Sequence, residues 1–328
     1  MIEVLSAGAL ATVQDLGRTG ALNLGVGTSG AMDPLALAAG NILLRNEENA
    51  AALEIPLFPF RVRFTRPTVF AVTGADCAPQ LDEAPVLPWW AHRADAGQVL
   101  ALAVPSAATW RACRAYLCIA GGIDVPLVLG SRSTQLRGAF GGLEGRPLRD
   151  GDGLPIVATS DRAKTGFGIT PPGLALPSEV DGLPAVRVLP AAEYDSFAPS
   201  SHEALWSEPW KITSQSDRYG YRLAGPELRP QRPMELRSHG IVPGVIQVPH
   251  GGQPIIQMRD AQPSGGYPKI GTVIDADLWR LGQAPIGSRI RFVLCNWDEA
   301  LDALAATRRW LSNVRRLVEL YCDQGAVR

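Results

Sequence analysis

Short apolar runs separated by glycine and proline recur along this chain, and they constrain its fold more than any other feature. The 328 residues include 34 Gly and 27 Pro, spread along most of the length. Apolar runs bounded by such turn-forming residues are typical of β-strands. The pattern therefore favours a mainly β fold over an alternating α/β fold. The predicted strands are 62–64, 69–73, 99–104, 116–120, 186–189, 245–248, 255–258 and 290–294.

Two segments predict helices instead. Asp33 is a good N-cap and Pro34 suits the first helical position, so we expect a helix from here to about Leu44. The second helix follows Asp298 and should be amphipathic. Its predicted apolar stripe comprises Leu301, Leu304, Leu311, Val314, Val318 and Tyr321, and its outer face carries Arg308, Arg309, Arg315 and Arg316. We expect this helix to pack on its own domain, and docking on a partner is the alternative.

The length of the chain suggests two domains. The segment 162–184 is polar, rich in Pro and Gly and without periodicity, which makes it the best boundary. We therefore predict an N-terminal β-rich domain over 1–180, a β-barrel domain over 181–296 and a C-terminal helix over 297–328. The segment 249–254 should turn the strand 245–248 back onto the strand 255–258.

Composition narrows the function classes. A net charge of −1 and a pI near 6.4 give no electrostatic footprint for nucleic acid or anionic lipid. The five cysteines include no C-x-x-C pair, which argues against a disulfide framework or a zinc site. No apolar stretch is long enough to span a membrane, and the N-terminus has no secretory pattern. We expect a cytoplasmic protein with reduced thiols and no metal site.

Familiar catalytic motifs are weak or missing. Gly25–Gly30 reads G-V-G-T-S-G, like a dinucleotide-binding fingerprint, but no strand of a βαβ unit precedes it. A tight turn with close backbone approach is the better interpretation. There is no P-loop, no G-x-S-x-G elbow and no Lys flanked by Met as in a biotin carrier.

The densest polar chemistry lies at Gln247 and over 253–269. If the strands around Gln247 and Gln257 pair, alternation places Gln257 opposite Ile256 and Met258. Such a polar face beside a Gly-Gly loop is typical of a small-molecule pocket, and a solvated sheet face is the equally weighted alternative. A carboxylate such as Asp260 and the amine of Lys269 could act as an acid–base pair if folding brings them within hydrogen-bond reach.

Two further polar sets lie earlier in the chain. The first includes Gln14, Asp15 and Arg18. The second comprises the glycine-rich segments 121–124, 130–134 and 141–142, which could form a nest of backbone amides that binds an anion. Ordinary turn chemistry explains this second set equally well.

Several long segments, in this order, resemble the allophanate hydrolase subunit 2 family. That family includes the KipA protein, 5-oxoprolinase C subunits and half of the carboxyltransferase domain of urea carboxylase, and the resemblance spans Ile2 to about Cys295. The segments that carry it are 12–18, 29–33, 120–126, 130–134, 145–148, 244–249 and 265–269.

Within the family, 214–223 and 236–240 are most similar to the 5-oxoprolinase C branch. One departure is the pair Pro263-Ser264, where the family commonly has two threonines. Pro263 lacks both the hydroxyl and the backbone donor.

The resemblance implies cyclophilin-like β-barrel domains and ATP-dependent opening of 5-oxoproline to glutamate. It also implies two partners, a KipI-like B subunit and a LamB/YcsF-like A subunit, with ATP consumed by the complex. On this basis Asp260 and Lys269 are the candidate catalytic residues. The candidate substrate-binding residues are Gln247, Gln257, Gln262, Ser264, Gly265, Gly266, Tyr267, Gln14 and Arg18.

Two other functions remain open. One is the carboxyltransferase half of a biotin-dependent system, with biotin supplied by another protein. The other is a KipA-like antagonist of a KipI-like kinase inhibitor, in which interface residues matter more than Lys269.

Overall fold

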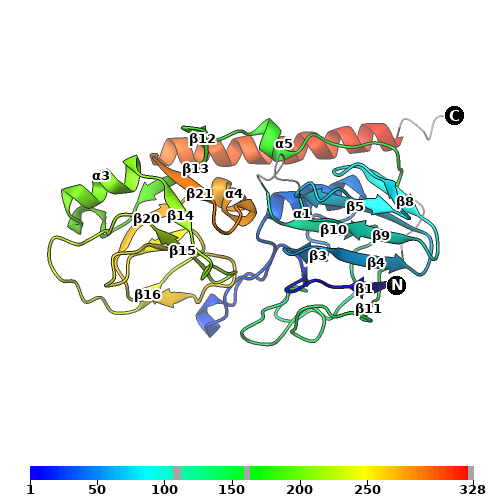
Figure 1. Ribbon diagram of the computed structural model, residues 1–328, viewed down its shortest axis with the longest axis horizontal. Coiled ribbons are helices and arrows are strands. Elements are labelled where there is room, and N and C mark those ends of the chain that lie inside the picture. The colour runs from blue at the N-terminus through cyan, green and yellow to red at the C-terminus, as the bar shows by residue number, and fades with distance from the viewer. Residues whose placement is uncertain (106–111, 159–162, 324–328) are drawn as a thin grey trace. The chain divides into compact units, whose positions relative to one another are not determined.

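The computed structural model describes residues 1–105, 112–158 and 163–323 (Figure 1), and the chain divides into two compact units. The second unit comprises Thr19–Thr28 and Leu176–Thr307, and the first comprises the rest. The main division thus falls five residues before the predicted boundary at 180. A short early segment belongs with the second unit, and the C-terminal helix is shared between the units.

The first unit contains two antiparallel sheets with a shared hydrophobic core. The core includes Phe60, Phe64, Phe70 and Leu117, each fully buried. The six-stranded sheet has the order β11 (Gly153–Leu154), β1 (Ile2–Ser6), β4 (Phe60–Phe64), β9 (Val99–Leu102), β6 (Gln80–Leu81) and β7 (Ala84–Pro85). The five-stranded sheet has the order β2 (Thr12–Gln14), β3 (Ala52–Ile55), β10 (Ala115–Ile119), β5 (Thr68–Gly74) and β8 (Ala91–Ala94).

Helix α1 (Pro34–Leu43) begins and ends close to the predicted bounds. The carboxylate of Asp33 accepts a hydrogen bond of 2.9 Å from the backbone N–H of Ala36, which confirms the N-cap. The helix is buried on nearly all sides because it packs against the five-stranded sheet, through residues such as Tyr116 and Cys118. A short helix, α2 (Pro172–Ala175), lies near the end of this unit.

The second unit is built on a closed barrel. Its strand order is β12 (Glu179–Val180), β13 (Leu183–Pro190), β20 (Lys269–Val273), β17 (Val245–Gln247), β18 (Ile255–Gln257), β15 (Gly220–Ala224), β14 (Trp210–Ile212) and β21 (Arg289–Leu294). Parallel pairing of β13 with β21 closes the sheet and removes its edges. The mainly β prediction is confirmed, and each predicted strand overlaps an observed one.

Smaller elements complete the second unit. A two-stranded ribbon pairs β16 (His239–Gly240) with β19 (Ser264–Gly265). The turn between β17 and β18 is as predicted. The helical elements are η1 (Leu22–Leu24), η2 (Tyr194–Ser196), α3 (Pro199–Ser207), η3 (Asp275–Asp277) and α4 (Leu278–Gln283).

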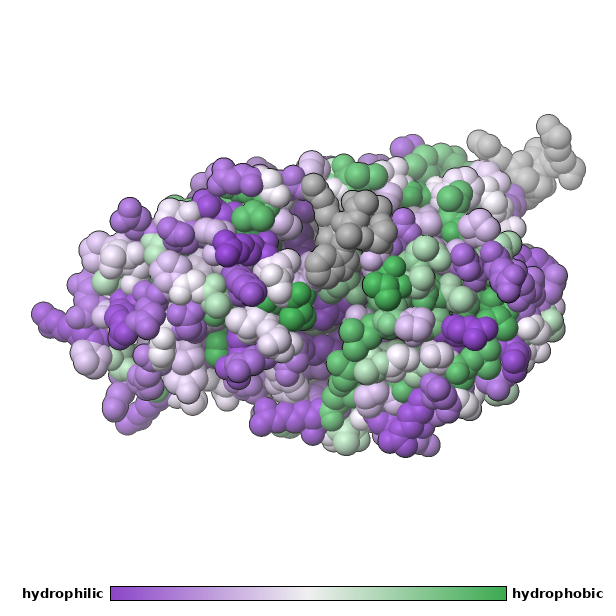
Figure 2. Space-filling model, in the orientation of Figure 1, coloured by the Kyte–Doolittle hydropathy of each residue, from purple (hydrophilic) through white to green (hydrophobic). Residues whose placement is uncertain are grey.

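Helix α5 (Trp297–Asp323) confirms a C-terminal amphipathic helix, but the predicted stripe was partly wrong. Leu301 and Tyr321 are 58% and 47% exposed. Val314 and Val318 of the stripe are buried as predicted, and the helix also buries three residues outside it: Ala303, Thr307 and Cys322. Figure 2 shows hydrophobic surface over α2 and the second half of α5, where Leu174, Leu317 and Leu320 are exposed.

The five cysteines are free thiols, as predicted. Burial raises the pKa of the Cys77 and Cys118 thiols to about 12, so both behave as small apolar side chains. Across the described ranges, no helix combines the length and the apolar character that crossing a bilayer requires.

Candidate functional site

Three predicted polar residues share one face of the barrel sheet. Gln247 on β17 is the register partner of Lys269 on β20, and Gln257 on β18 donates a 3.0 Å hydrogen bond to the side-chain oxygen of Gln247. Their exposed fractions are 3%, 4% and 5% for Gln247, Lys269 and Gln257. Because all three are buried, this face is not a solvated one.

Two hydrogen-bond donors on this face lack a strong acceptor. The amide nitrogen of Gln247 is buried and has no hydrogen-bond partner among the described residues. Among the residues that the structure describes, the Nζ of Lys269 has only two contacts, both of 3.4 Å, to Nδ1 of His239 and the carbonyl of Gly265. We call Gln247 Nε2 and Lys269 Nζ the donor pair. Buried donors of this kind are costly unless an acceptor is bound, so the pair suits a carboxylate, phosphoryl or carbonyl oxygen.

The ammonium charge of Lys269 is buried without a carboxylate from the described chain bound to it. It forms no ion pair with any residue in the part of the chain that the structure describes. The carboxylate of Glu193 accepts a 3.1 Å hydrogen bond from the backbone N–H of Lys269, not from its side chain. Burial lowers the pKa of the Lys269 ammonium, and the negative charge of Glu193 only partly opposes this.

The ribbon of β16 and β19 passes over the donor pair. Gly265 is paired with His239, and its carbonyl is the one that contacts Lys269. A Cβ added at Gly265 would lie 2.4 Å from Gln247 Nε2 and 3.1 Å from Ile241. Glycine here lets the backbone approach the buried amide, and any side chain would have to displace Gln247.

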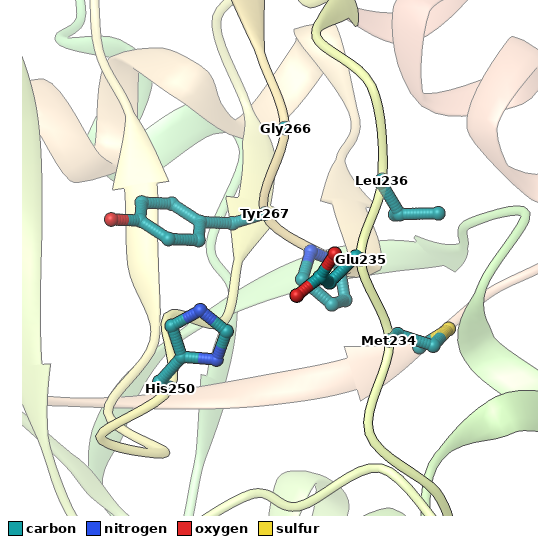
Figure 3. A pocket seen from close by; sticks show the side chains of 7 residues that line it. Met234, Glu235, Leu236, His250, Gly266 and Tyr267 are labelled. Atoms are coloured by element: carbon teal, nitrogen blue, oxygen red, sulfur yellow. The ribbon is translucent and has the colours of Figure 1, made fainter.

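A cavity of about 410 Å³ lies beside this ribbon (Figure 3). Residues 266–268, which connect β19 to β20 and hence to Lys269, form part of its wall. In Figure 3 the rings of Tyr267 and His250 lie on one side of the Glu235 carboxylate, and they meet edge to face at 6.1 Å. The lining residues are Met234, Glu235, Leu236, His250, Gly266, Tyr267 and Pro268. Of the predicted binding residues, Gly266 and the 45%-exposed Tyr267 line this cavity.

Asp260 lies elsewhere in the second unit. Its carboxylate is buried and accepts two hydrogen bonds from the guanidinium of Arg218, at 2.9 and 3.0 Å. No hydrogen bond or ion pair joins it to Lys269 in the described chain, so the condition for an acid–base pair is not met. The bidentate pair instead fixes the 217–220 turn against the loop after β18.

Two other predicted residues near this loop are exposed. Gln262 faces solvent, and Ser264 pairs with Gly240 in the ribbon. The carbonyl of Pro263 accepts a 2.9 Å hydrogen bond from Ile241, so proline still contributes to the ribbon without its missing donor. The fingerprint-like segment packs on the same loop, because a Cβ at Gly27 would lie 2.4 Å from the carbonyl of Ala261. No strand leads into that segment among the described residues, which supports a close-packed turn.

Gln14 and Arg18 belong to the first unit, where the two earlier polar sets come together. The carboxylate of Asp15 accepts hydrogen bonds from the hydroxyls of Ser131 (2.6 Å) and Ser133 and from the backbone of Gly17 and Arg132. We call this cluster the Asp15 centre. Of the segments predicted to form a nest of amides, all of them described, only 130–134 contacts this carboxylate, through one backbone amide and two hydroxyls.

The side chains around this centre are also held internally. Arg18 donates a 2.6 Å hydrogen bond to the carbonyl of Ser133 and lies over the ring of Phe140. Gln14 donates to Thr12 and to the carbonyl of Thr134, while its own oxygen is buried without a partner in the described structure. The buried oxygen of Gln14 is thus still open to a donor, and the binding role of Gln14 and Arg18 stays a prediction.

Sequence reasoning missed His239, Glu193 and Arg218 as neighbours of the site residues. His239 lies 30 positions from Lys269, and only pairing of β16 with β19 brings it near. Within the described ranges, no cluster of His, Cys, Asp and Glu is arranged to hold a metal ion.

Comparison with known proteins places the chain. Residues 24–294 match the family model "Carboxyltransferase domain, subdomain A and B", and the chain belongs to this family. It is 43% identical over 314 residues to the C subunit of the Escherichia coli 5-oxoprolinase, covering 96% of this chain and 97% of that protein. It is 42% identical over 319 residues to the C subunit of the Haemophilus influenzae 5-oxoprolinase, covering 97% and 99%. The crystal structure of K. lactis urea amidolyase superposes with a TM-score of 0.85 and 30% identity, over 95% of this chain and 20% of that one.

Proposed function

We propose that this chain is the C subunit of an ATP-dependent 5-oxoprolinase that opens 5-oxo-L-proline to L-glutamate. The observation that carries the proposal is the buried donor pair, in a chain similar over nearly its whole length to two subunits of that name. The substrate is a lactam that also bears a carboxylate, so it offers anionic and carbonyl oxygens to buried donors.

The donor pair supplies electrostatic stabilisation. A lactam resists water until its carbonyl oxygen is activated, and transfer of a phosphoryl group from ATP to that oxygen would provide the activation. Lys269 Nζ and Gln247 Nε2 would hold the negative oxygen of the carboxylate or phosphoryl group. Donors fixed in a site from which water is excluded typically contribute about 10²–10³-fold in rate each. The cavity next to the ribbon would admit the substrate.

The chain would act as part of a complex in the cytoplasm. A KipI-like B subunit and a LamB/YcsF-like A subunit are the proposed partners, and ATP is consumed by the assembled complex. Asp260 remains a proposed contributor through its salt bridge with Arg218, which anchors the loop that leads into Ser264 and Tyr267.

Reconstitution tests this proposal. The chain would be purified together with its B and A partners, and glutamate and ADP would be measured after addition of 5-oxoproline and ATP. We expect turnover that disappears when this chain is omitted and when Lys269→Met replaces it in an intact complex. An intact complex that produces no glutamate contradicts the proposal.

A second function is favoured by the family name, which indicates carboxyl transfer, and here we propose biotin as the carboxyl carrier. In that case the donor pair would hold the carbonyl oxygen of carboxybiotin, supplied on a separate carrier. The distinguishing assay offers the chain a carboxylated biotin carrier and urea and measures carboxyl transfer. Transfer without 5-oxoproline hydrolysis would establish this second function.

The same Lys269→Met variant tests a KipA-like regulatory role. If the chain only sequesters a KipI-like kinase inhibitor, the wild-type chain and the Lys269→Met variant should relieve kinase inhibition equally well. Unchanged relief, together with no hydrolysis by the wild-type complex, would favour the regulator.

A further inference from the structure

An exposed imidazole meets the buried amine of Lys269. His239 lies on the ribbon strand β16 and is exposed to solvent, whereas Lys269 is 4% exposed. Nδ1 of His239 is 3.4 Å from Nζ of Lys269 and 3.2 Å from the backbone carbonyl of Arg237. His239 thus lies between solvent and the buried ammonium of Lys269.

The two contacts of Nδ1 require different protonation states. An ammonium group only donates, so a hydrogen bond from Lys269 requires a lone pair on Nδ1. A carbonyl only accepts, so a hydrogen bond to Arg237 requires a proton on Nδ1. The geometry therefore accommodates two arrangements: charged Lys269 with an unprotonated Nδ1, and neutral Lys269 with Nδ1–H donating to Arg237.

We propose that His239 is a positioning residue that carries protons between solvent and the amine of Lys269, a role that rests on the proposed function above. Solvent donates one proton to Nε2 of the imidazole, and Nδ1 gives one proton to the Nζ lone pair. The net change is one proton moved from water to Lys269, and the reverse sequence discharges it. His239 thereby restores the ammonium whenever Lys269 gives up a proton during turnover.

The surroundings allow Lys269 to exist in both forms. The groups that face it are the carboxylate of Glu193, the imidazole of His239, the carbonyl of Gly265 and the uncharged amide of Gln247. Glu193 is engaged with backbone rather than with Nζ, and burial lowers the pKa of the ammonium. A buried lysine without a bound counterion changes protonation more readily than an exposed one.

The composition of the chain makes this relay directly measurable. Only three lysines occur, Lys164, Lys211 and Lys269, so ¹³C-labelled lysine in the full chain gives three side-chain signals that single substitutions assign. We expect the Lys269 signal to titrate below the ordinary range of a lysine and to show a second inflection caused by proton exchange with the imidazole of His239. In His239→Gln the second inflection disappears, while in His92→Gln it remains. His92 is a suitable control because its ring contacts Phe70 and Leu87 in the first unit.

An identical Lys269 titration in wild type and His239→Gln overturns the proposal. The measurement needs no substrate, so it stands even if 5-oxoproline proves not to be the substrate. If His239→Gln loses the second inflection but the wild-type complex makes no glutamate, the proton coupling is supported and the proposed function is contradicted.

Activity provides the second measurement. In the reconstituted complex, His239→Ala should lower kcat by about 100-fold with little change in KM, and added imidazole should restore part of the rate. A purely structural role for His239 predicts no rescue and no change in the shape of the pH–rate profile. An unaltered pH–rate profile in His239→Ala would contradict the relay.

Discussion

The Asp15 centre and the donor pair bury charged groups to a similar extent but satisfy them differently. Asp15 accepts hydrogen bonds from two hydroxyls and two backbone amides, and these bonds offset the free-energy cost of removing its carboxylate from water. Within the described ranges, Lys269 Nζ has long contacts only, and the buried amide nitrogen of Gln247 has no acceptor. Native proteins rarely leave buried polar groups unpaired without a functional reason. The first centre therefore stabilises its unit, and the second is suited to a ligand.

Glycine contributes to both regions in different ways. At the Asp15 centre, a Cβ on Gly141 would lie 2.1 Å from the carbonyl of Ser133, so backbone closes against backbone. At the donor pair, the atom nearest to a Cβ on Gly265 would be the unpaired nitrogen of Gln247. Gly141 therefore allows close backbone packing, whereas Gly265 allows strand β19 to lie directly over the side-chain amide of Gln247.

The largest expected effect separates activity from stability at Lys269. Lys269→Met keeps the length of the side chain and removes the charge, so turnover of the complex should fall by about 10²–10³-fold. Because the uncompensated charge disappears, the free energy of unfolding should rise by up to about 1 kcal/mol. Urea unfolding and the glutamate assay measure the two effects.

The matched control is Lys211→Met, since Lys211 is exposed on β14. This substitution should leave both the turnover of the complex and the free energy of unfolding unchanged. A Lys269→Met chain that is markedly less stable than wild type would mean that Lys269, like Asp15, belongs to the structural class.

The second effect should appear at Asp15. Asp15→Ala leaves several buried donors without their acceptor, and the free energy of unfolding should fall by about 3 kcal/mol. Asp95→Ala, at a 73%-exposed carboxylate, should change it by less than about 0.5 kcal/mol. The opposite result would be an Asp15→Ala chain that unfolds at the same urea concentration as wild type while its complex loses turnover. That result would contradict the assignment of a structural role to Asp15 and a ligand-binding role to the donor pair.

A smaller effect should follow from Gly265→Ala. The added methyl group would displace the side chain of Gln247, and a displacement of this size should lower turnover between about 10- and 100-fold. Gly240→Ala is the matched control, because Gly240 lies on the partner strand of the same ribbon and a Cβ there meets nothing within 4 Å. Equal loss of turnover in both variants would show that the ribbon, rather than its approach to Gln247, controls the rate.

The sequence was sufficient for features that depend on local pattern. Alternation along 255–258 and the turn at 249–254 placed Gln247 and Gln257 on neighbouring strands, and Asp33-Pro34 marked the start of α1. Contacts between residues far apart in the chain could not be predicted from local pattern. The salt bridge from Arg218 to Asp260 and the approach of His239 to Lys269 join segments 42 and 30 residues apart. The stripe of α5 was predicted in its middle, at Val314 and Val318, but spacing alone did not reveal that Leu301 and Tyr321 lie exposed while the small Ala303 is buried.

The smallest effect is the pH dependence of stability. Burial lowers the pKa of Lys269 in the folded chain below the ordinary value of 10.5 that the unfolded chain retains. The unfolded chain therefore binds more protons between the folded pKa and 10.5, and unfolding becomes harder as pH rises through that window. The cost of the buried ammonium is fully present below the folded pKa. The stability advantage of Lys269→Met over wild type should thus be constant near neutral pH and shrink as pH approaches 10.5. An advantage independent of pH would mean that Lys269 is solvated well enough to keep its ordinary pKa, and the two buried charges would then differ less than their hydrogen bonds indicate.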